Sequence, residues 1–150
     1  MARSFQFSSW IDAPVSKVFA FHEHPDALER LTPPGQKLEI LERTNGIQPG
    51  SRVVLRGSLG PMTMEWHARH TIYEEDSLFV DEQEKGPFKQ WTHRHEFERE
   101  GRGTRLTDSI EYSMKGGPLL EFLGGWFVNY QLRKMFRWRH KVTKAFCEKA

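Results

Sequence analysis

The chain has 150 residues, an ordinary length for one domain, and folding at this length buries about 70% of the surface of the unfolded chain. Hydrophobic residues make up 37% of the sequence, and 11 Phe, 5 Trp and 3 Tyr predict a core rich in rings. A single cysteine, Cys147, excludes an internal disulfide, and no apolar run approaches the roughly 18 residues of a membrane span. Without a charged-then-apolar leader, we expect one domain over residues 1–150 in the cytoplasm.

The net charge of +2 is distributed unevenly. The segment from Arg133 to Lys149 holds seven basic residues and one acid, a charge of +6, which leaves −4 for the rest of the chain. A basic end of this kind can meet a membrane, a nucleic acid or an anionic ligand. RNA-binding sheets carry aromatic side chains that stack on bases, and this basic segment has no such arrangement on a strand. We therefore expect a solvated helix face, no nucleic-acid partner and no stable membrane insertion.

The first forty residues predict a strand followed by two short helices. Residues 3–11 alternate in polarity, which indicates the strand. Asp12 offers an N-cap and Pro14 suits the first turn of a helix, so residues 14–24 should be helical. A second short helix is expected at residues 25–31, where a pair of prolines then ends it.

From residue 37 to residue 112, turn-forming pairs such as Asn-Gly and Pro-Gly separate strand-like runs, and six successive antiparallel strands are the simplest interpretation. Beyond these runs the apolar period becomes helical for nearly thirty residues, which predicts one long amphipathic helix. Gly124 and Gly125 interrupt it, and they would permit a bend or a close approach to a strand or ligand. The expected apolar face consists of Leu119, Phe122 or Leu123, Trp126, Tyr130, Met135, Val142 and Phe146.

This order of elements resembles the START-like helix-grip superfamily (SRPBCC), in its polyketide cyclase/dehydrase and lipid-transfer branch. The phrases that carry the resemblance are VFAFHEHPDALERLTPP (18–34), FVDEQEKGPFKQWTHRHEF (79–97) and TRLTDSIEY (104–112). They look like an uncharacterised bacterial ligand-binding subgroup. The resemblance implies an α+β helix-grip fold, in which a curved antiparallel sheet of about seven strands surrounds a long C-terminal helix and two short helices follow the first strand. It also implies a cavity between sheet and helix, with hydrophobic ligands in many relatives.

Strand alternation places aromatic and ionisable side chains together on the concave face of the sheet. Because cross-strand neighbours lie about 5 Å apart, His93 or His95 should reach Asp81 or Asp108, and such pairing would satisfy groups that are costly to bury alone. The candidate ligand-binding residues are Trp66, His70, Asp81, Gln83, Trp91, His93, His95, Phe97, Asp108, Tyr112, Trp126 and Tyr130.

Three interpretations compete for His93 and His95. They could bind a metal with Asp81, Asp108 or His70 as further ligands, they could hydrogen-bond carboxylates within a closed core, or they could orient a ligand in a pocket with apolar walls. We favour ligand recognition, rank the metal last, and expect neither a metal nor another cofactor. His22 and His24, between the two short helices, are expected to face solvent.

Three functions follow from these patterns. The first is binding of a small hydrophobic or cyclic molecule between the sheet and the C-terminal helix. The second is a cyclase/dehydrase-type enzyme in which His93 or His95 acts as general acid or base. The third is an interaction module whose basic helix docks on an anionic partner or membrane surface. The sequence indicates no particular oligomeric state.

Overall fold

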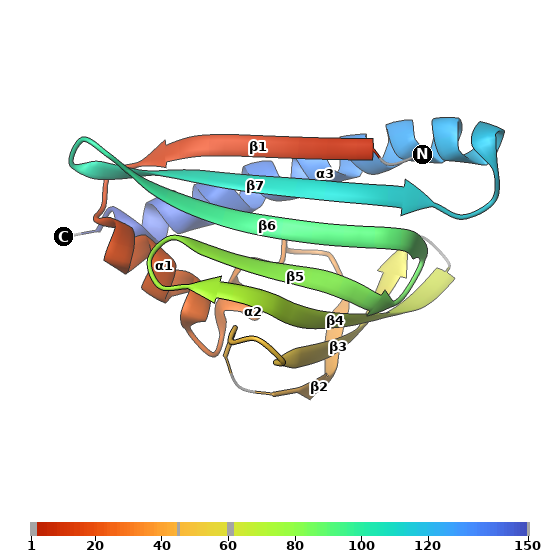
Figure 1. Ribbon diagram of the computed structural model, residues 1–150, viewed down its shortest axis with the longest axis horizontal. Coiled ribbons are helices and arrows are strands. Elements are labelled where there is room, and N and C mark those ends of the chain that lie inside the picture. Colours follow the sequence, from red (N-terminus) through yellow and green to blue (C-terminus); the bar gives the residue numbers. More distant parts are fainter. Residues whose placement is uncertain (1–2, 45, 60–61, 150) are drawn as a thin grey trace.

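The computed structural model describes residues 3–44, 46–59 and 62–149. Seven strands and three helices follow the order expected from the sequence (Figure 1). They are β1 (Arg3–Ile11), α1 (Val15–Glu23), α2 (Ala27–Arg30), β2 (Leu38–Arg43), β3 (Arg52–Leu59), β4 (Met62–Glu74), β5 (Leu78–Lys85), β6 (Phe88–Glu100), β7 (Gly103–Met114) and α3 (Pro118–Cys147).

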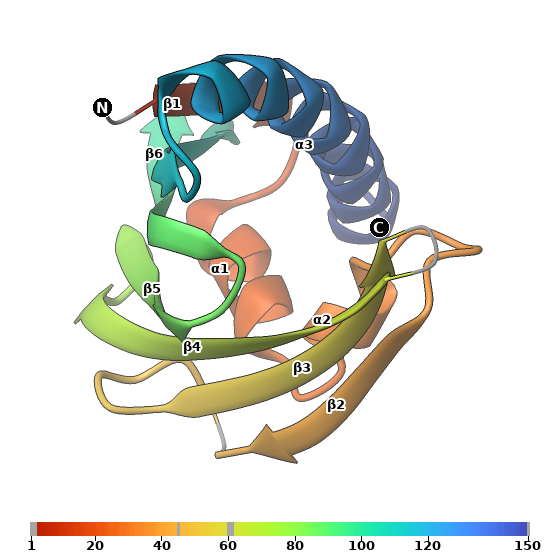
Figure 2. The ribbon, with the colours of Figure 1, turned by 90° about the vertical axis from the view of Figure 1, so that its right-hand side faces the viewer.

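The strands form one antiparallel sheet in the order β1-β7-β6-β5-β4-β3-β2. Strands β2 to β7 therefore pair with their neighbours in sequence, and β1 closes the sheet against β7. Figure 2 shows the sheet curving, with β2, β3 and β4 sweeping away from α3, while β1 lies beside the helix. The predicted α+β helix-grip fold, a curved antiparallel sheet with a long C-terminal helix, is confirmed.

Two clusters of buried side chains form the core. In the first, Phe19 of α1 packs edge-to-face on Phe79 and Phe97, with ring centroids 6.1 and 4.9 Å away. Burial of each such ring contributes about 2 kcal/mol, and the edge-to-face geometry is the one that aromatic quadrupoles favour. The second cluster lies between α3 and the strands β1 and β7, and it consists of Phe5, Ile110, Tyr112, Leu132 and Phe136.

The inward side of α3 differs from the one predicted. Trp126 and Tyr130 were expected to face the sheet, but they are 76% and 60% exposed. The first half of α3 carries large apolar side chains around most of its circumference, and its first turns extend past the N-terminal end of β1 (Figure 1). The spacing of apolar residues alone therefore did not identify the side of α3 that packs against the sheet. The buried residues of α3 are Gly125, Leu132, Phe136, His140, Thr143 and Cys147.

The glycine pair in α3 allows a close approach to two strands. Gly125 is buried, and a Cβ there would collide with the Arg3 side chain of β1. The Tyr112 hydroxyl of β7 donates a hydrogen bond to Asn129 Oδ1 at 2.5 Å and lies 3.1 Å from the Gly125 carbonyl. Of the two roles considered for the glycines, the structure shows the approach to a strand.

Asp12 does not cap α1, contrary to the prediction. Pro14 occupies the N-cap position and makes no side-chain hydrogen bond to the helix. The Asp12 carboxylate instead accepts a hydrogen bond from Arg102 at 2.8 Å, while its amide donates to Glu148 at 2.9 Å. Asp12 therefore ties the start of α1 to the β6–β7 turn and to the end of α3.

Among the described residues, no helix combines the length and the apolar character needed to cross a membrane.

Candidate functional site

The candidate site begins with the register of the three central strands. Asp81 of β5 lies opposite His93 of β6, and His95 lies opposite Asp108 of β7. Successive side chains of a strand alternate between faces, so these four groups share the inner face of the sheet. They form one cluster under α3.

Hydrogen bonds join the cluster as the sequence predicted. Asp108 Oδ1 accepts from His93 Nε2 at 2.7 Å and lies 3.2 Å from His95 Nδ1. Asp81 Oδ2 accepts from His95 Nε2 at 2.8 Å and lies 4.0 Å from His93 Nδ1. The two imidazole rings stack with centroids 3.6 Å apart. Each of the two histidines therefore has one ring nitrogen near Asp81 and the other near Asp108.

Two members of this network were missed in the sequence, because they come from distant elements. His140 of α3 donates from Nε2 to Asp108 Oδ2 at 2.6 Å, and its Nδ1 lies 2.5 Å from the Ser9 hydroxyl of β1. The connection Ser9–His140–Asp108 has the order of a hydrolase triad. Ser9 lines neither of the two pockets described below, so we assign this connection to holding α3 on β1 and β7.

Burial and hydrogen bonding shift the pKa values of the aspartates and of His95 in opposite directions. Burial alone would raise the pKa of Asp108, but hydrogen bonds from His140, His93 and His95 hold it well below its usual range. Burial likewise acts to raise the pKa of Asp81, which the His95 bond and the charge of His93 bring down to about 2. Burial acts to lower the pKa of His95, yet its bonds to both aspartates raise it overall. Burial and the neighbouring His95 lower the pKa of His93. A positive charge is therefore best stabilised on His95.

Asp81, His93 and His95 also have the composition of a partial metal site. Each offers one ligand atom, and these atoms lie within 4.8 Å of one another. A structural zinc site needs four ligands. Its histidines commonly bond a carboxylate through the ring nitrogen that does not bind the metal, and Asp108 would be that carboxylate here.

A small cavity of about 20 Å³ adjoins the cluster. This volume is close to that of one water molecule. Of the two histidines considered for acid-base catalysis, His95 lines the cavity and His93 does not. The lining residues are His22, Leu31, His95, Asp108, Phe136, Arg139, His140 and Thr143.

His22 corrects the expectation that both histidines near α1 face solvent. It lines the small cavity, its Nδ1 donates to the Val18 carbonyl at 2.8 Å, and its ring lies 5.1 Å from Phe97. Burial lowers its pKa to about 4, so His22 is neutral at neutral pH. His24 is exposed, as expected, and lies 3.0 Å from the Asp26 carboxylate.

An aromatic wall continues the inner face beyond the histidines. Trp66 of β4 and Trp91 of β6 meet edge-to-face with ring centroids 4.8 Å apart. Phe88 lies 5.5 Å from Trp66 and 4.8 Å from Trp91. All three side chains are half-buried, so part of each ring is free to contact another molecule.

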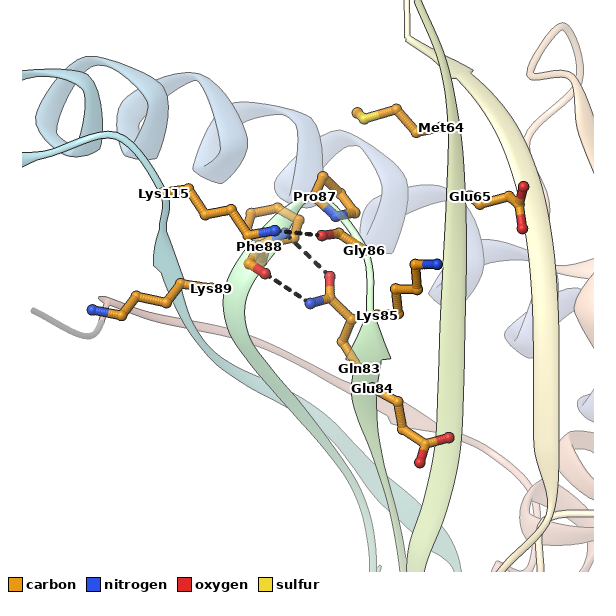
Figure 3. Close-up of a pocket in the computed structure, with 10 residues that line it drawn as sticks. All are labelled: Met64, Glu65, Gln83, Glu84, Lys85, Gly86, Pro87, Phe88, Lys89 and Lys115. Carbon is orange, nitrogen blue, oxygen red and sulfur yellow. Dashed lines mark hydrogen bonds between the residues drawn. The ribbon is translucent and has the colours of Figure 1, made fainter.

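A groove of about 530 Å³ opens beside this wall, next to the β5–β6 turn. The pairing of β4 with β5 ends at His67 and Lys85, so the beginning of β4 diverges from the turn. Figure 3 shows Gln83, predicted as a ligand contact, bonded instead to the Phe88 backbone, at 2.8 Å to its carbonyl and 3.2 Å to its amide. The groove is lined by Met64, Glu65, Gln83, Glu84, Lys85, Gly86, Pro87, Phe88, Lys89 and Lys115.

The structure does not bring all predicted site residues together. Phe97 and Tyr112 are fully enclosed in the two core clusters, and Trp126 and Tyr130 lie on the exposed side of α3. His70 of β4 lies opposite Asp81 and is half-buried, and its Nδ1 has no hydrogen-bond partner among the described residues. The candidate site therefore narrows to the histidine and aspartate cluster and the aromatic wall.

The fold and this inner face define a helix-grip protein with a mixed aromatic and ionisable interior. The sequence matches the model of the polyketide cyclase/dehydrase and lipid transport family over residues 11–139, and the chain belongs to this family. The family indicated by the sequence phrases is confirmed. A comparison with curated proteins finds no match.

Solved structures with the same fold include the Zhui aromatase/cyclase from Streptomyces sp. R1128, with a TM-score of 0.77, 14% identity and coverage of 99% of this chain and 94% of that chain. Ara h 8.0201 has a TM-score of 0.72 and 17% identity, with 98% of both chains covered. A nucleoside-diphosphate sugar epimerase from Corynebacterium glutamicum has a TM-score of 0.69 and 26% identity over 94% of this chain, which spans 28% of that protein.

Proposed function

We propose that the protein binds a small hydrophobic or cyclic molecule between the inner face of the sheet and α3. The ligand enters through the groove beside the β5–β6 turn and lies against Trp66, Phe88 and Trp91. The histidine and aspartate cluster orients its polar end. Membership in a family of cyclases, dehydrases and lipid transporters supports this assignment.

The observation that carries the proposal is the half-buried aromatic wall, which meets the groove at Phe88. A side chain needed only for core packing would be enclosed, as Tyr112 is, whereas Trp66 and Trp91 keep part of their surface free. Ligand pockets commonly have volumes of about 300–1,000 Å³ and combine apolar walls with a few polar groups. The groove has a volume of about 530 Å³ and meets the wall at Phe88.

Titration with Nile red, a neutral apolar fluorophore, tests the proposal. We expect saturable binding, and Trp66→Ala or Trp91→Ala should weaken it by about tenfold or more, because each indole offers a large contact area. Trp10→Phe is the matched control, since the Trp10 indole bonds the Glu100 carbonyl at 3.0 Å, away from the wall. The proposal would be contradicted if both wall variants bound Nile red as tightly as the wild type, or if the wild type did not bind it.

A second candidate function, docking on an anionic membrane surface, is favoured by the exposed side of α3. Its first half exposes seven large apolar side chains: Leu119, Leu120, Phe122, Leu123, Trp126, Phe127 and Tyr130. Exposed basic side chains follow them along the helix: Arg133, Lys134, Arg137 and Lys141. Glu121 is the single acidic residue in the sequence of α3. Aromatic and basic residues together are typical of helices that lie in an anionic lipid interface.

Sedimentation with phosphatidylglycerol vesicles tests this second function. Binding should weaken with salt and disappear with phosphatidylcholine vesicles, because exposed charges are screened. Trp126→Ser and the double change Arg133→Gln with Arg137→Gln should each reduce binding, whereas Trp10→Phe should not. Equal binding to both kinds of vesicle, or to neither, would count against docking through charge.

A further inference from the structure

Three side chains of β5 and β6 bring ligand atoms together in one small volume. The ligand atoms of Asp81, His93 and His95 lie within 4.8 Å of one another. Asp81 Oδ2 lies 2.8 Å from His95 Nε2 and 4.0 Å from His93 Nδ1. Two ligands of a tetrahedral zinc ion lie about 3.3 Å apart, because each is about 2.0–2.1 Å from the metal. The observed spacings fall on both sides of this value, so small side-chain rotations would let one ion replace the hydrogen bond between His95 and Asp81.

Asp108 determines which ring nitrogens of the two histidines can bind an ion. Its Oδ1 lies 2.7 Å from His93 Nε2 and 3.2 Å from His95 Nδ1. A neutral imidazole carries one N–H, so a ring that donates to Asp108 keeps its lone pair on the nitrogen nearer Asp81. In metal sites, a carboxylate commonly orients a ligating histidine through its second nitrogen in this way. Asp108 is therefore placed to orient both rings toward an ion beside Asp81.

His70 offers a further ligand from the neighbouring strand β4. It lies opposite Asp81 in the pairing of β4 with β5, and such neighbours have Cβ atoms about 4.5–5.5 Å apart on one face of the sheet. Its Nδ1 is buried and has no hydrogen-bond partner among the described residues. Burial of a polar nitrogen without a partner is costly, so an ion that accepts its lone pair would stabilise the ring.

The strand register supplies the completing ligands that the sequence left open. We propose that one divalent metal ion of the zinc class binds here, with four ligands: His70, Asp81, His93 and His95. Three imidazoles and one carboxylate suit zinc and similar first-row dications, whereas magnesium and calcium prefer oxygen ligands. The carboxylates of Asp81 and Asp108 supply negative charge that favours a dication. The site goes beyond the proposed function, because it requires no apolar ligand.

The side of the cluster that faces β4 gives the ion a way in. The side chain of Asp81 is 17% exposed and His70 is half-buried, whereas the side chain of His93 is 6% exposed. An ion held by these ligands joins three adjacent strands, β4, β5 and β6. Zinc should therefore raise the temperature of thermal unfolding, since it binds the folded chain in preference to the unfolded one.

Titration of the full, untagged chain with zinc, in competition with a fluorescent chelator, tests the inference. We expect one zinc ion per chain. His70→Gln should weaken binding by about tenfold or more, because even the loss of a group behind a metal ligand costs about 10–100-fold. His67→Gln is the matched control and should keep the wild-type affinity. His67 lies on the same strand, and its ring is 3.3 Å from the Glu65 carboxylate.

Two measurements on the wild-type protein do not depend on the folding of a variant. Cobalt(II) in place of zinc should show the strong visible absorption of a four-coordinate ion, whereas a six-coordinate ion absorbs weakly. The ¹⁵N resonances of the His93 and His95 rings should shift when zinc is added. Those of His24, an exposed histidine paired with Asp26, should not.

The outcomes separate this inference from the proposed function. An unchanged zinc affinity in His70→Gln, unmoved His93 and His95 resonances, or only weak binding of several ions to the surface would overturn the metal site. Binding of Nile red without binding of zinc would also overturn it and would leave the proposed function standing. Binding of zinc as expected without binding of Nile red would support the metal site and overturn the proposed function.

Discussion

Asp108 and His140 lie 32 positions apart in the sequence, yet His140 Nε2 donates to Asp108 Oδ2 at 2.6 Å in the buried interior. This bond joins α3 to the middle of β7, and the same carboxylate also accepts from His93 at 2.7 Å. A buried carboxylate shared by several imidazoles stabilises the site only while all partners remain. Asp108 is therefore the centre of the network.

Replacing Asp108 with asparagine should destabilise the protein strongly. The neutral amide removes the charged acceptor and brings an N–H₂ group against the histidine donors, and loss of one partner of a buried pair costs about 3–5 kcal/mol. Urea unfolding measures the loss. Asp12→Asn is the control, because its pair with Arg102 is exposed and such pairs contribute about 1 kcal/mol or less. Similar small losses in the two variants would contradict a central role for Asp108.

Acid should destabilise the protein through His22. Its pKa falls from 6.5 to about 4 on folding because the ring is buried, so between these values the unfolded chain binds a proton that the folded chain does not. The stability that neutral His22 contributes is complete above pH 6.5 and is lost as the pH falls toward 4.

Replacing His22 with leucine should therefore reduce the loss of unfolding free energy between neutral and acidic pH. Urea midpoints at several pH values measure this slope. His24→Leu, which changes an exposed histidine two residues later, should keep the slope of the wild type. An unchanged slope in the His22 variant would show that the ring titrates freely in the folded state.

Tyr112→Phe should loosen the first half of α3. The buried hydroxyl donates to Asn129 Oδ1 and lies next to the Gly125 carbonyl, and its removal should cost about 1–2 kcal/mol. Amide hydrogen exchange should become faster in the first turns of α3 while the centre of the sheet stays protected. Tyr130→Phe is the control on an exposed tyrosine and should leave exchange unchanged. Equal exchange in both variants would argue against anchoring by Tyr112.

The Gly125 position can be tested with a double-mutant cycle. Alanine is favoured over glycine in a helix by about 1 kcal/mol, but at Gly125 the added Cβ meets the Arg3 side chain, which donates to the Phe122 carbonyl at 3.3 Å. We expect Gly125→Ala to raise the free energy of unfolding of the Arg3→Ala variant by about 1 kcal/mol. The same change should raise that of the wild type by clearly less. Thermal unfolding of the four proteins measures the coupling, and equal effects in both backgrounds would exclude the contact.

The strand part of the site could be predicted from the sequence because strand side chains alternate and hairpins fix the register. Alternation placed Asp81, His93, His95 and Asp108 on one face, and the pairing of β5, β6 and β7 brings them together. Alternation did not indicate that the amide of Gln83, which also lines the groove, bonds the backbone of the adjacent turn.

The helical part could not be predicted in the same way. The most apolar positions in the first half of α3 are exposed, so counting apolar residues selected the wrong side. The spacing of Leu132, Phe136, His140, Thr143 and Cys147, at four, four, three and four residues, was the signal for the buried side. It was obscured because a histidine and a threonine occupy two of these positions. His140 was missed for that reason.

Native mass spectrometry of untagged protein purified from its own host is a direct test of ligand binding at the aromatic wall. We expect a co-purified small apolar molecule, bound one to one, that is retained by Trp10→Phe and lost or depleted in Trp66→Ala and Trp91→Ala. A wild-type protein that carries no such molecule and also fails to bind Nile red would contradict ligand binding.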